Sequence, residues 1–257
     1  MNAGPQDTTL DEIRREIDAI DDGLLDLLAR RFQASARVRG VKTGDGTLRA
    51  SPIRPAREAE ILRRLMARRD ADVAPETLVR LWRVILTSST LAQAAVTVHL
   101  PAAVNETPQL RDAVTLHFAA TPVVVHEGAA AAIDSLGARP GDVAVVTPQS
   151  GWTLALAASG RKAPRVIGVL PQVSAAREPA LLILGHAPAQ PSGDDRTLLV
   201  GTAPWRGAAV PDWQVRSGTQ HVVCLPGFFD EAMIQRDLAP LGWRLAGRYP
   251  TPLKVPS

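Results

Sequence analysis

Two cationic side chains lie on a helical track whose other members are mostly apolar. The track reads Ile17, Asp21, Leu24, Leu28, Arg31, Ser35, Val38 and Lys42. Arg31 and Lys42 are eleven residues apart, so a helix returns them to the same face within ~20°, about 16 Å apart along its axis. Cations on an inward-facing track are costly unless an anion meets them. Taken alone, this track favours a solvated helix end with extended side chains, and an anion site is the alternative.

A second helical track also changes from apolar to polar. It reads Leu78, Trp82, Ile85, Ser89, Gln93 and Val96. Ser89 and Gln93 are four residues apart, so both project from one face of a helix. Buried hydroxyl and amide groups require hydrogen-bond partners. Two tracks of this kind predict a polar pocket inside a helical bundle.

A fork-shaped donor and a carboxylate lie together at the start of another predicted helix. Arg57 and Glu58 follow Pro55, a residue favoured in the first turn. A guanidinium can bind a carboxylate through two parallel hydrogen bonds, and Glu58 can accept a proton donor. The alternative is an ordinary charged first turn in which Glu58 complements the helix dipole.

The elements that must position these residues are one very long helix and two shorter ones. Apolar spacing predicts a helix from about residue 10 to residue 42, capped by Thr8 or Thr9 and stopped at Gly44 to Gly46. Such a helix is roughly 50 Å long, so it needs partner helices, and we expect them from a second copy of the chain. The other helices are expected over residues 55–69 and 75–98.

Beyond the helices, the chain changes character. Short β-rich runs alternate with Gly and Pro, and a boundary is expected where a helical pattern meets Leu100-Pro101. We therefore expect an all-α domain over residues 1–99 and an α/β domain over residues 100–257, with some parallel strands. Strands are predicted at 123–125, 143–146, 166–169, 181–184, 198–200 and 222–225, and helices at 127–136 and 229–238.

Composition excludes several classes of protein. The 257 residues carry a formal charge of +3 and are 46% hydrophobic, which favours a folded protein and does not indicate a nucleic-acid footprint. The start of the sequence lacks the apolar core of a signal peptide, and no apolar run approaches the ~20 residues of a membrane span. We expect a soluble, cytoplasmic protein. The single cysteine, Cys224, is expected to be buried rather than reactive.

Residues 10–96 resemble the all-α chorismate mutase family. The stretch LDEIRREIDAIDDGLLDLLARR is similar to that family's opening helix, and PAREAE is similar to its Arg-Glu signature. The matching positions are Arg14, Arg31, Lys42, Arg57, Glu58, Ser89 and Gln93. The resemblance implies an L-shaped protomer of three helices and an intertwined homodimer in which Arg14 acts in trans. One departure is Arg54, where some members carry Asp.

The resemblance implies an isomerase of aromatic amino-acid biosynthesis that rearranges chorismate to prephenate. This [3,3] rearrangement needs no cofactor or metal, only a folded substrate dianion and donors to the breaking ether oxygen. Arg14 and Arg31 would bind carboxylates, with Arg57 and Ser89 reinforcing them. Lys42 and Gln93 would donate to the ether oxygen, as in an oxyanion hole, and Glu58 would accept from the ring hydroxyl.

The C-terminal region resembles a shortened prephenate dehydratase-like domain. The similar segments are 141–148, 181–185, 193–197 and 247–250. The dehydratase family carries a Thr-Arg-Phe motif where this chain has Pro179-Ala180-Leu181-Leu182, so its acid/base and substrate-binding residues are missing. We expect a degenerate domain that is structural or regulatory.

Two alternative functions stay open. One is a bifunctional mutase–dehydratase, against which the missing motif argues. The other is a non-enzymatic, Arg-rich helical dimer that binds nucleic acid, with an affinity that falls steeply with salt. This second alternative leaves Ser89 and Gln93 unexplained.

Overall fold

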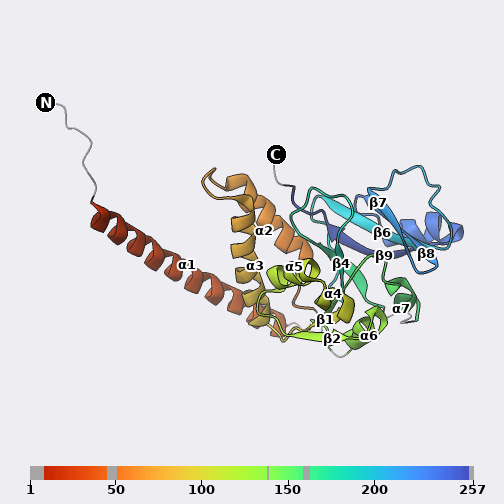
Figure 1. The fold of residues 1–257 in the computed structure, drawn as a ribbon, viewed down its shortest axis with the longest axis horizontal. Helices are drawn as coiled ribbons and strands as arrows, with labels where there is room; N and C mark the ends of the chain where they lie inside the picture. The colour runs from red at the N-terminus through yellow and green to blue at the C-terminus, as the bar shows by residue number, and fades with distance from the viewer. Residues whose placement is uncertain (1–8, 45–50, 138, 159–162, 255–257) are drawn as a thin grey trace. The chain divides into compact units, whose positions relative to one another are not determined.

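The chain divides into two compact units. The computed structural model describes residues 9–44, 51–137, 139–158 and 163–254. By contact, the first unit is Met1–Leu48 and the second is Arg49–Ser257. The first contains one helix, and the second contains the other helices and a large sheet (Figure 1).

The first unit is built around α1 (Leu10–Gly44), a helix of 35 residues. Thr9 and Glu12 cap its start reciprocally: the Thr9 amide donates to the Glu12 carboxylate at 2.8 Å, and the Glu12 amide donates to the Thr9 hydroxyl at 3.3 Å. At 1.5 Å per residue the helix is roughly 52 Å long. The long helix expected from the sequence is therefore confirmed, with Gly44 at its end.

Two helices follow in the second unit. These are α2 (Pro55–Arg68) and α3 (Pro75–Leu91), each with proline in its first turn. They pack on each other around Leu62, Val79 and Leu86. The third helix is shorter than predicted: it ends at Leu91 instead of near Val98, and Gln93 lies in the turn that follows. The chain must leave the helix there because Val98 already pairs in the sheet.

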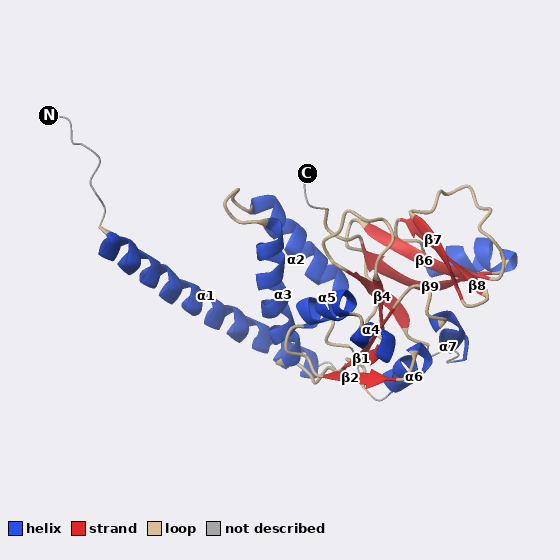
Figure 2. Ribbon diagram, viewed as in Figure 1, coloured by secondary structure: helices blue, strands red, loops and turns tan. Residues whose placement is uncertain are grey.

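A nine-stranded mixed sheet forms the centre of the second unit (Figure 2). Its strands are β1 (Val98–Pro101), β2 (Val123–His126), β3 (Val143–Val146), β4 (Arg165–Leu170), β5 (Leu181–Gly185), β6 (Asp195–Gly201), β7 (Trp213–Ser217), β8 (Gln220–Pro226) and β9 (Trp243–Pro250). Their order is β2-β1-β3-β5-β4-β9-β6-β8-β7. The pairs β1–β2, β1–β3 and β4–β9 are parallel, as expected for part of the sheet.

Short helices cover both faces of this sheet. On one face, α6 (Ala129–Asp134) and α7 (Trp152–Ala158) pack on alternate residues of the central strands, with Trp152 fully buried. On the other face lie α4 (Ala102–Glu106), α5 (Pro108–Phe118) and the segment of α8 (Glu231–Met233) with its π and 3-10 continuation, residues 234–241. The alternation of buried side chains between the two cores is typical of strands.

The two halves of the sheet join where β4 meets β9. Val166 pairs with Gly247, and a β-carbon at Gly247 would overlap the backbone nitrogen and oxygen of Val166. Glycine is therefore required for this close approach of two backbones. All six strands predicted from the sequence are present, whereas β1, β7 and β9 were not predicted.

The helices α2 and α3 belong by contact to the second unit. Arg63 of α2 donates from Nη1 to the Ser192 carbonyl at 2.7 Å and from Nη2 to the Asp194 carbonyl at 2.7 Å. α2 also contacts β9, and α3 contacts α5. The expected sequence boundary near residue 99 therefore differs from the division by contact. No helix in the described part of the chain is long and apolar enough to cross a membrane.

Candidate active site

Two neighbouring charged residues in the first turn of α2, Arg57 and Glu58, point in different directions. Successive helical side chains are ~100° apart, so Arg57 and Glu58 cannot share a face. Arg57 is 64% exposed and pairs with Glu60 at 3.0 Å. Glu58 is only 13% exposed and points toward Arg83 of α3, inside the second unit.

Glu58 forms a buried ion pair with Arg83 of α3. The Arg83 Nη1 to Glu58 Oε2 distance is 2.7 Å, and the Arg83 side chain is only 5% exposed. The same guanidinium donates from Nε to the His117 carbonyl at 3.3 Å and from Nη1 to Gln172 Oε1 at 3.3 Å. Removing either charge would leave the other buried and unpaired, which is strongly destabilising. The ion pair therefore joins α2, α3, α5 and the end of β4.

His117 completes this polar centre from the end of α5. Its carbonyl also accepts from the Thr87 hydroxyl at 3.3 Å, and its ring meets Phe118 edge-on with 4.6 Å between centroids. Burial, reinforced by the nearby Arg83 charge, lowers the pKa of His117 well below its usual value. The imidazole is therefore neutral at physiological pH.

A pocket of about 260 Å³ opens beside the ion pair. Its lining includes Glu76, Arg80, Arg83, His117, Gln172 and Ser174. Apolar residues of α3, α5 and the segment after β4 line the rest, including Val79, Leu116 and Val173. The pocket can accept a small molecule whose polar end reaches Arg80 or Arg83.

Ser89 and Gln93 lie together at the end of α3. The buried Ser89 hydroxyl donates to the Ile85 carbonyl at 2.8 Å, and Gln93 Nε2 donates to the Ser89 carbonyl at 3.1 Å. The amide of Gln93 thus satisfies one of the last carbonyls of the helix. Ser89 lies six residues beyond Arg83, roughly 9 Å along the axis.

The remaining predicted site residues lie on α1. Arg14 is 66% exposed and pairs with Asp11 at 3.2 Å. Arg31 is half-buried, and its partial burial lowers its pKa. Lys42 lies within the helix, but its side chain is outside the described part of the structure.

The sequence interpretation missed Arg83. The predicted apolar track of α3 passes through Trp82 and Ile85, which are half-buried, whereas Arg83, Leu86 and Thr87 are buried. The helix buries a second face because it packs on both α2 and α5. Val79, Arg83 and Thr87 follow one another at steps of four residues, and this spacing could have indicated that the helix buries a second face.

Comparison with known proteins finds a similarity for the helical segment. Residues 13–94 match the family model described as chorismate mutase type II, which is 82 of the 257 residues. The match covers nearly all of α1, all of α2 and α3, and the turn that carries Gln93. No curated protein and no solved structure matches the chain.

The match is a similarity over about a third of the chain. A chorismate mutase type II region over residues 13–94 indicates an isomerase enzyme. The chain combines this helical region with a mixed α/β sheet region, for which the comparisons found no family. No group of three His, Cys, Asp or Glu residues that could hold a metal ion occurs within the described ranges.

Proposed function

We propose that this protein is a chorismate mutase that converts chorismate to prephenate by an intramolecular [3,3] rearrangement. The observation that carries the proposal is the family match, which spans all seven predicted site residues from Arg14 to Gln93. The substrate is a dianion, and the reaction transfers no proton and needs no nucleophile. Arginine, lysine and amide donors are the groups such a reaction requires.

The arginines would select the reactive conformer. A guanidinium binds a carboxylate through two coplanar hydrogen bonds, so Arg14 and Arg31 can fix both carboxylates of the substrate. Holding the side chain over the ring keeps the substrate in the conformer from which the rearrangement occurs. Arg57, exposed on α2, and the Ser89 hydroxyl would support carboxylate binding.

Lys42 and Gln93 would stabilise the transition state. Negative charge develops on the ether oxygen as its bond to carbon breaks, and two fixed donors there lower the barrier, each by roughly 3 kcal/mol. Gln93 Nε2 now donates to the Ser89 carbonyl. A substrate oxygen would replace that acceptor when the substrate binds.

Arg83 would act as a positioning residue for Glu58. It holds Glu58 Oε2 at 2.7 Å and is itself fixed by the His117 carbonyl and Gln172. A carboxylate held this way keeps its second oxygen available to accept from the ring hydroxyl of the substrate. Glu58 would thus contribute to substrate binding.

A homodimer is part of the proposal. The apolar residues of α1 are largely exposed in the single chain: Leu10, Ile13, Ile17, Ile20, Leu24, Leu25, Leu27 and Phe32. An exposed apolar stripe of this length is typical of helices that pack on another copy. In the dimer, Arg14 would enter the partner's site, while Arg31, Lys42, Arg57, Glu58, Ser89 and Gln93 would act within their own chain.

Incubation of the pure protein with chorismate tests the proposal directly. We expect chorismate to disappear and prephenate to accumulate, without phenylpyruvate before acid treatment. Phenylpyruvate formation would instead support a mutase–dehydratase. Unchanged chorismate, from protein shown to be folded, would contradict both enzyme functions.

Mixing two inactive variants tests the shared site. Arg14→Ala and Lys42→Ala chains would each lack one element, and a hybrid dimer would carry one site with neither change. We expect partial recovery of activity on mixing after dissociation and reassociation. Confirmed hybrid dimers without recovery would contradict the trans role of Arg14.

A further inference from the structure

A second pocket lies in the sheet region, on the face shared by its last four strands. It has a volume of about 360 Å³. β9, β6, β7 and β8 contribute Tyr249, Arg196, Trp213 and Cys224, respectively. Register places all four on one face, since Arg196 pairs with Tyr249 and Trp213 pairs with Cys224, which itself pairs with Leu198.

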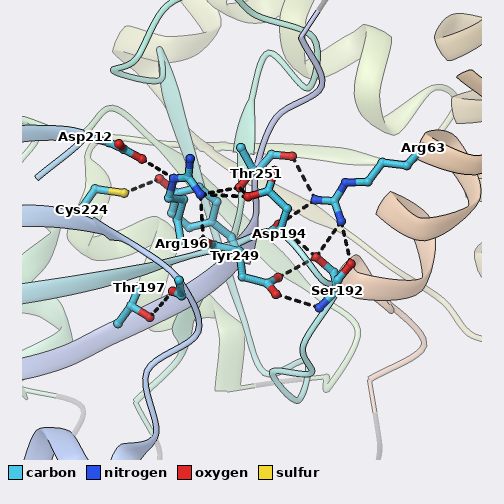
Figure 3. A network of polar contacts seen from close by, with 11 residues as sticks. Arg63, Ser192, Asp194, Arg196, Thr197, Asp212, Cys224, Tyr249 and Thr251 are labelled. Carbon is cyan, nitrogen blue, oxygen red and sulfur yellow. Dashed lines mark hydrogen bonds and ion pairs between the residues drawn. The ribbon is translucent and has the colours of Figure 1, made fainter. Parts of the chain in front are cut away.

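The floor of this pocket is formed by Trp213, Cys224 and Tyr249, whose polar groups contact one another. The Tyr249 hydroxyl accepts from Trp213 Nε1 at 3.2 Å and lies 3.0 Å from Cys224 Sγ. Figure 3 shows the contact between Tyr249 and Cys224. All three side chains are almost completely buried. These contacts engage the Trp213 indole N–H and join Tyr249 to Cys224, so the floor is mainly aromatic and apolar, which suits the apolar body of a ligand.

The floor also lacks an active nucleophile. Burial raises the pKa of the Cys224 thiol to about 12, so the thiol stays protonated at physiological pH. This agrees with the buried, unreactive cysteine expected from the sequence. The pocket is suited to binding rather than to covalent chemistry.

The wall and rim of the pocket are cationic. Arg177, Arg196 and Lys254 line it, against one carboxylate, Asp212. Arg196 pairs with Asp212 through Nε, and its Nη1 donates to Asp194 at 3.0 Å and to Thr251 at 2.8 Å. Its Nη2 has no hydrogen bond within the described ranges, although the side chain is only 19% exposed.

Two further cations at the rim have no ion pair in the described part of the chain. Arg177 lies in the segment between β4 and β5, and Lys254 follows β9. Pro171, Val210 and Pro211 add apolar surface to the lining. The pocket thus joins an apolar, aromatic floor to a rim with an excess of positive charge.

We propose that this pocket binds a small organic carboxylate with a flat apolar body. The ring would lie against Trp213 and Tyr249, and the carboxylate would meet Arg177, Lys254 and the free nitrogen of Arg196. The volume falls at the lower end of the range for small-molecule sites, about 300–1,000 Å³, which suits a single ring with short substituents. This inference does not depend on the mutase activity.

The experiment measures binding of benzoate to the full protein by isothermal titration calorimetry. Benzamide keeps the ring and replaces the carboxylate with a neutral group, and inorganic phosphate keeps the negative charge and omits the ring. We expect saturable benzoate binding, with benzamide and phosphate each at least ~10-fold weaker, because charge and ring are both required. No saturable benzoate binding, or equal affinity for either analogue, would overturn the proposal.

Variants test whether benzoate binds in this pocket. The double variant Arg177→Ala/Lys254→Ala should weaken benzoate binding at least ~10-fold, whereas Arg206→Ala, an exposed arginine outside the pocket, should leave it unchanged. Ala176→Trp, at an exposed position that lines the pocket, should block binding by filling the cavity. Lys42→Ala should bind benzoate normally. Binding that survives Ala176→Trp, or that is lost in Lys42→Ala, would assign benzoate to another site and overturn the inference.

Discussion

The helix α1 and the pair α2–α3 share one family match but differ in their surroundings. α1 is a compact unit by itself and exposes most of its apolar stripe. α2 and α3 are joined to each other by the Glu58–Arg83 ion pair, and hydrogen bonds of Arg63 and Arg83 join them to the rest of the second unit. One matched segment is thus divided between a helix that exposes apolar residues and two helices that are part of a larger core. Substitutions in the two regions should therefore have different consequences.

The largest effect is expected from loss of the buried cation on α3. Arg83→Met removes the partner of Glu58 and leaves a buried carboxylate unpaired, which should lower the free energy of unfolding by about 3–5 kcal/mol. Urea denaturation measures this loss, and Arg80→Met, on the same helix, provides the matched control. A variant as stable as the parent protein would show that the ion pair does not hold α2–α3 in place.

A smaller effect, confined to activity, is expected on α1. Lys42→Ala should reduce kcat at least ~100-fold, since it removes a donor to the developing charge. Its unfolding midpoint should stay unchanged. Arg37→Ala, an exposed cation on the same helix, should keep full activity. Near-parental turnover of Lys42→Ala would remove this residue from the mechanism.

Loss of Arg63, which joins α2 to the sheet region, should lower stability by a smaller amount. Arg63→Ala loses charged hydrogen bonds to the carbonyls of Ser192 and Asp194, which are worth about 1.5–3 kcal/mol. Its neighbour Arg64 is exposed and makes a matched control as Arg64→Ala. Equal unfolding midpoints for the two variants would contradict a role of Arg63 in joining α2 to the sheet.

The smallest expected effect is a loss of stability in acid. Burial lowers the pKa of His99 and, more strongly, of His117. The unfolded chain then binds more protons than the folded chain, so stability is complete above the unfolded pKa of about 6.5 and falls as the pH drops below it. Urea midpoints at pH 7.5 and about pH 5.5 measure the change.

Variants test whether His117 causes the loss of stability in acid. His117→Leu should reduce the difference between the two pH values, whereas His186→Gln, at an exposed position, should not. An unchanged pH dependence in His117→Leu would exclude this histidine as its source. α1 contains no histidine, so its helicity should not follow the same titration.

Much of the fold follows from local patterns in the sequence. The 35-residue α1, the starts of α2 and α3 at Pro55 and Pro75, and six of the strands agree with their apolar periodicity. The strand β9 escaped prediction because its alternation is interrupted by Arg244, Gly247 and Arg248. Glycine at position 247 is needed for contact with β4, a pairing of distant segments that no local pattern shows.

The candidate site likewise has features that the sequence shows and features that only the tertiary structure shows. The types and order of Arg14, Arg31, Lys42, Arg57, Glu58, Ser89 and Gln93 are properties of the sequence, and all seven lie within the segment that matches the chorismate mutase type II model. The sequence could not show that Glu58 pairs with Arg83, because that contact depends on the packing of α2, α3 and α5.

The sequence by itself determined the helical module, its ligand-type residues and the chemistry they suit, because residue type and helical spacing are local properties. Only the tertiary structure decided that α2 and α3 join the sheet region, and that Arg177, Arg196 and Lys254 surround one pocket. These residues are far apart in the chain, and their meeting is set by the order and register of the strands rather than by any local preference.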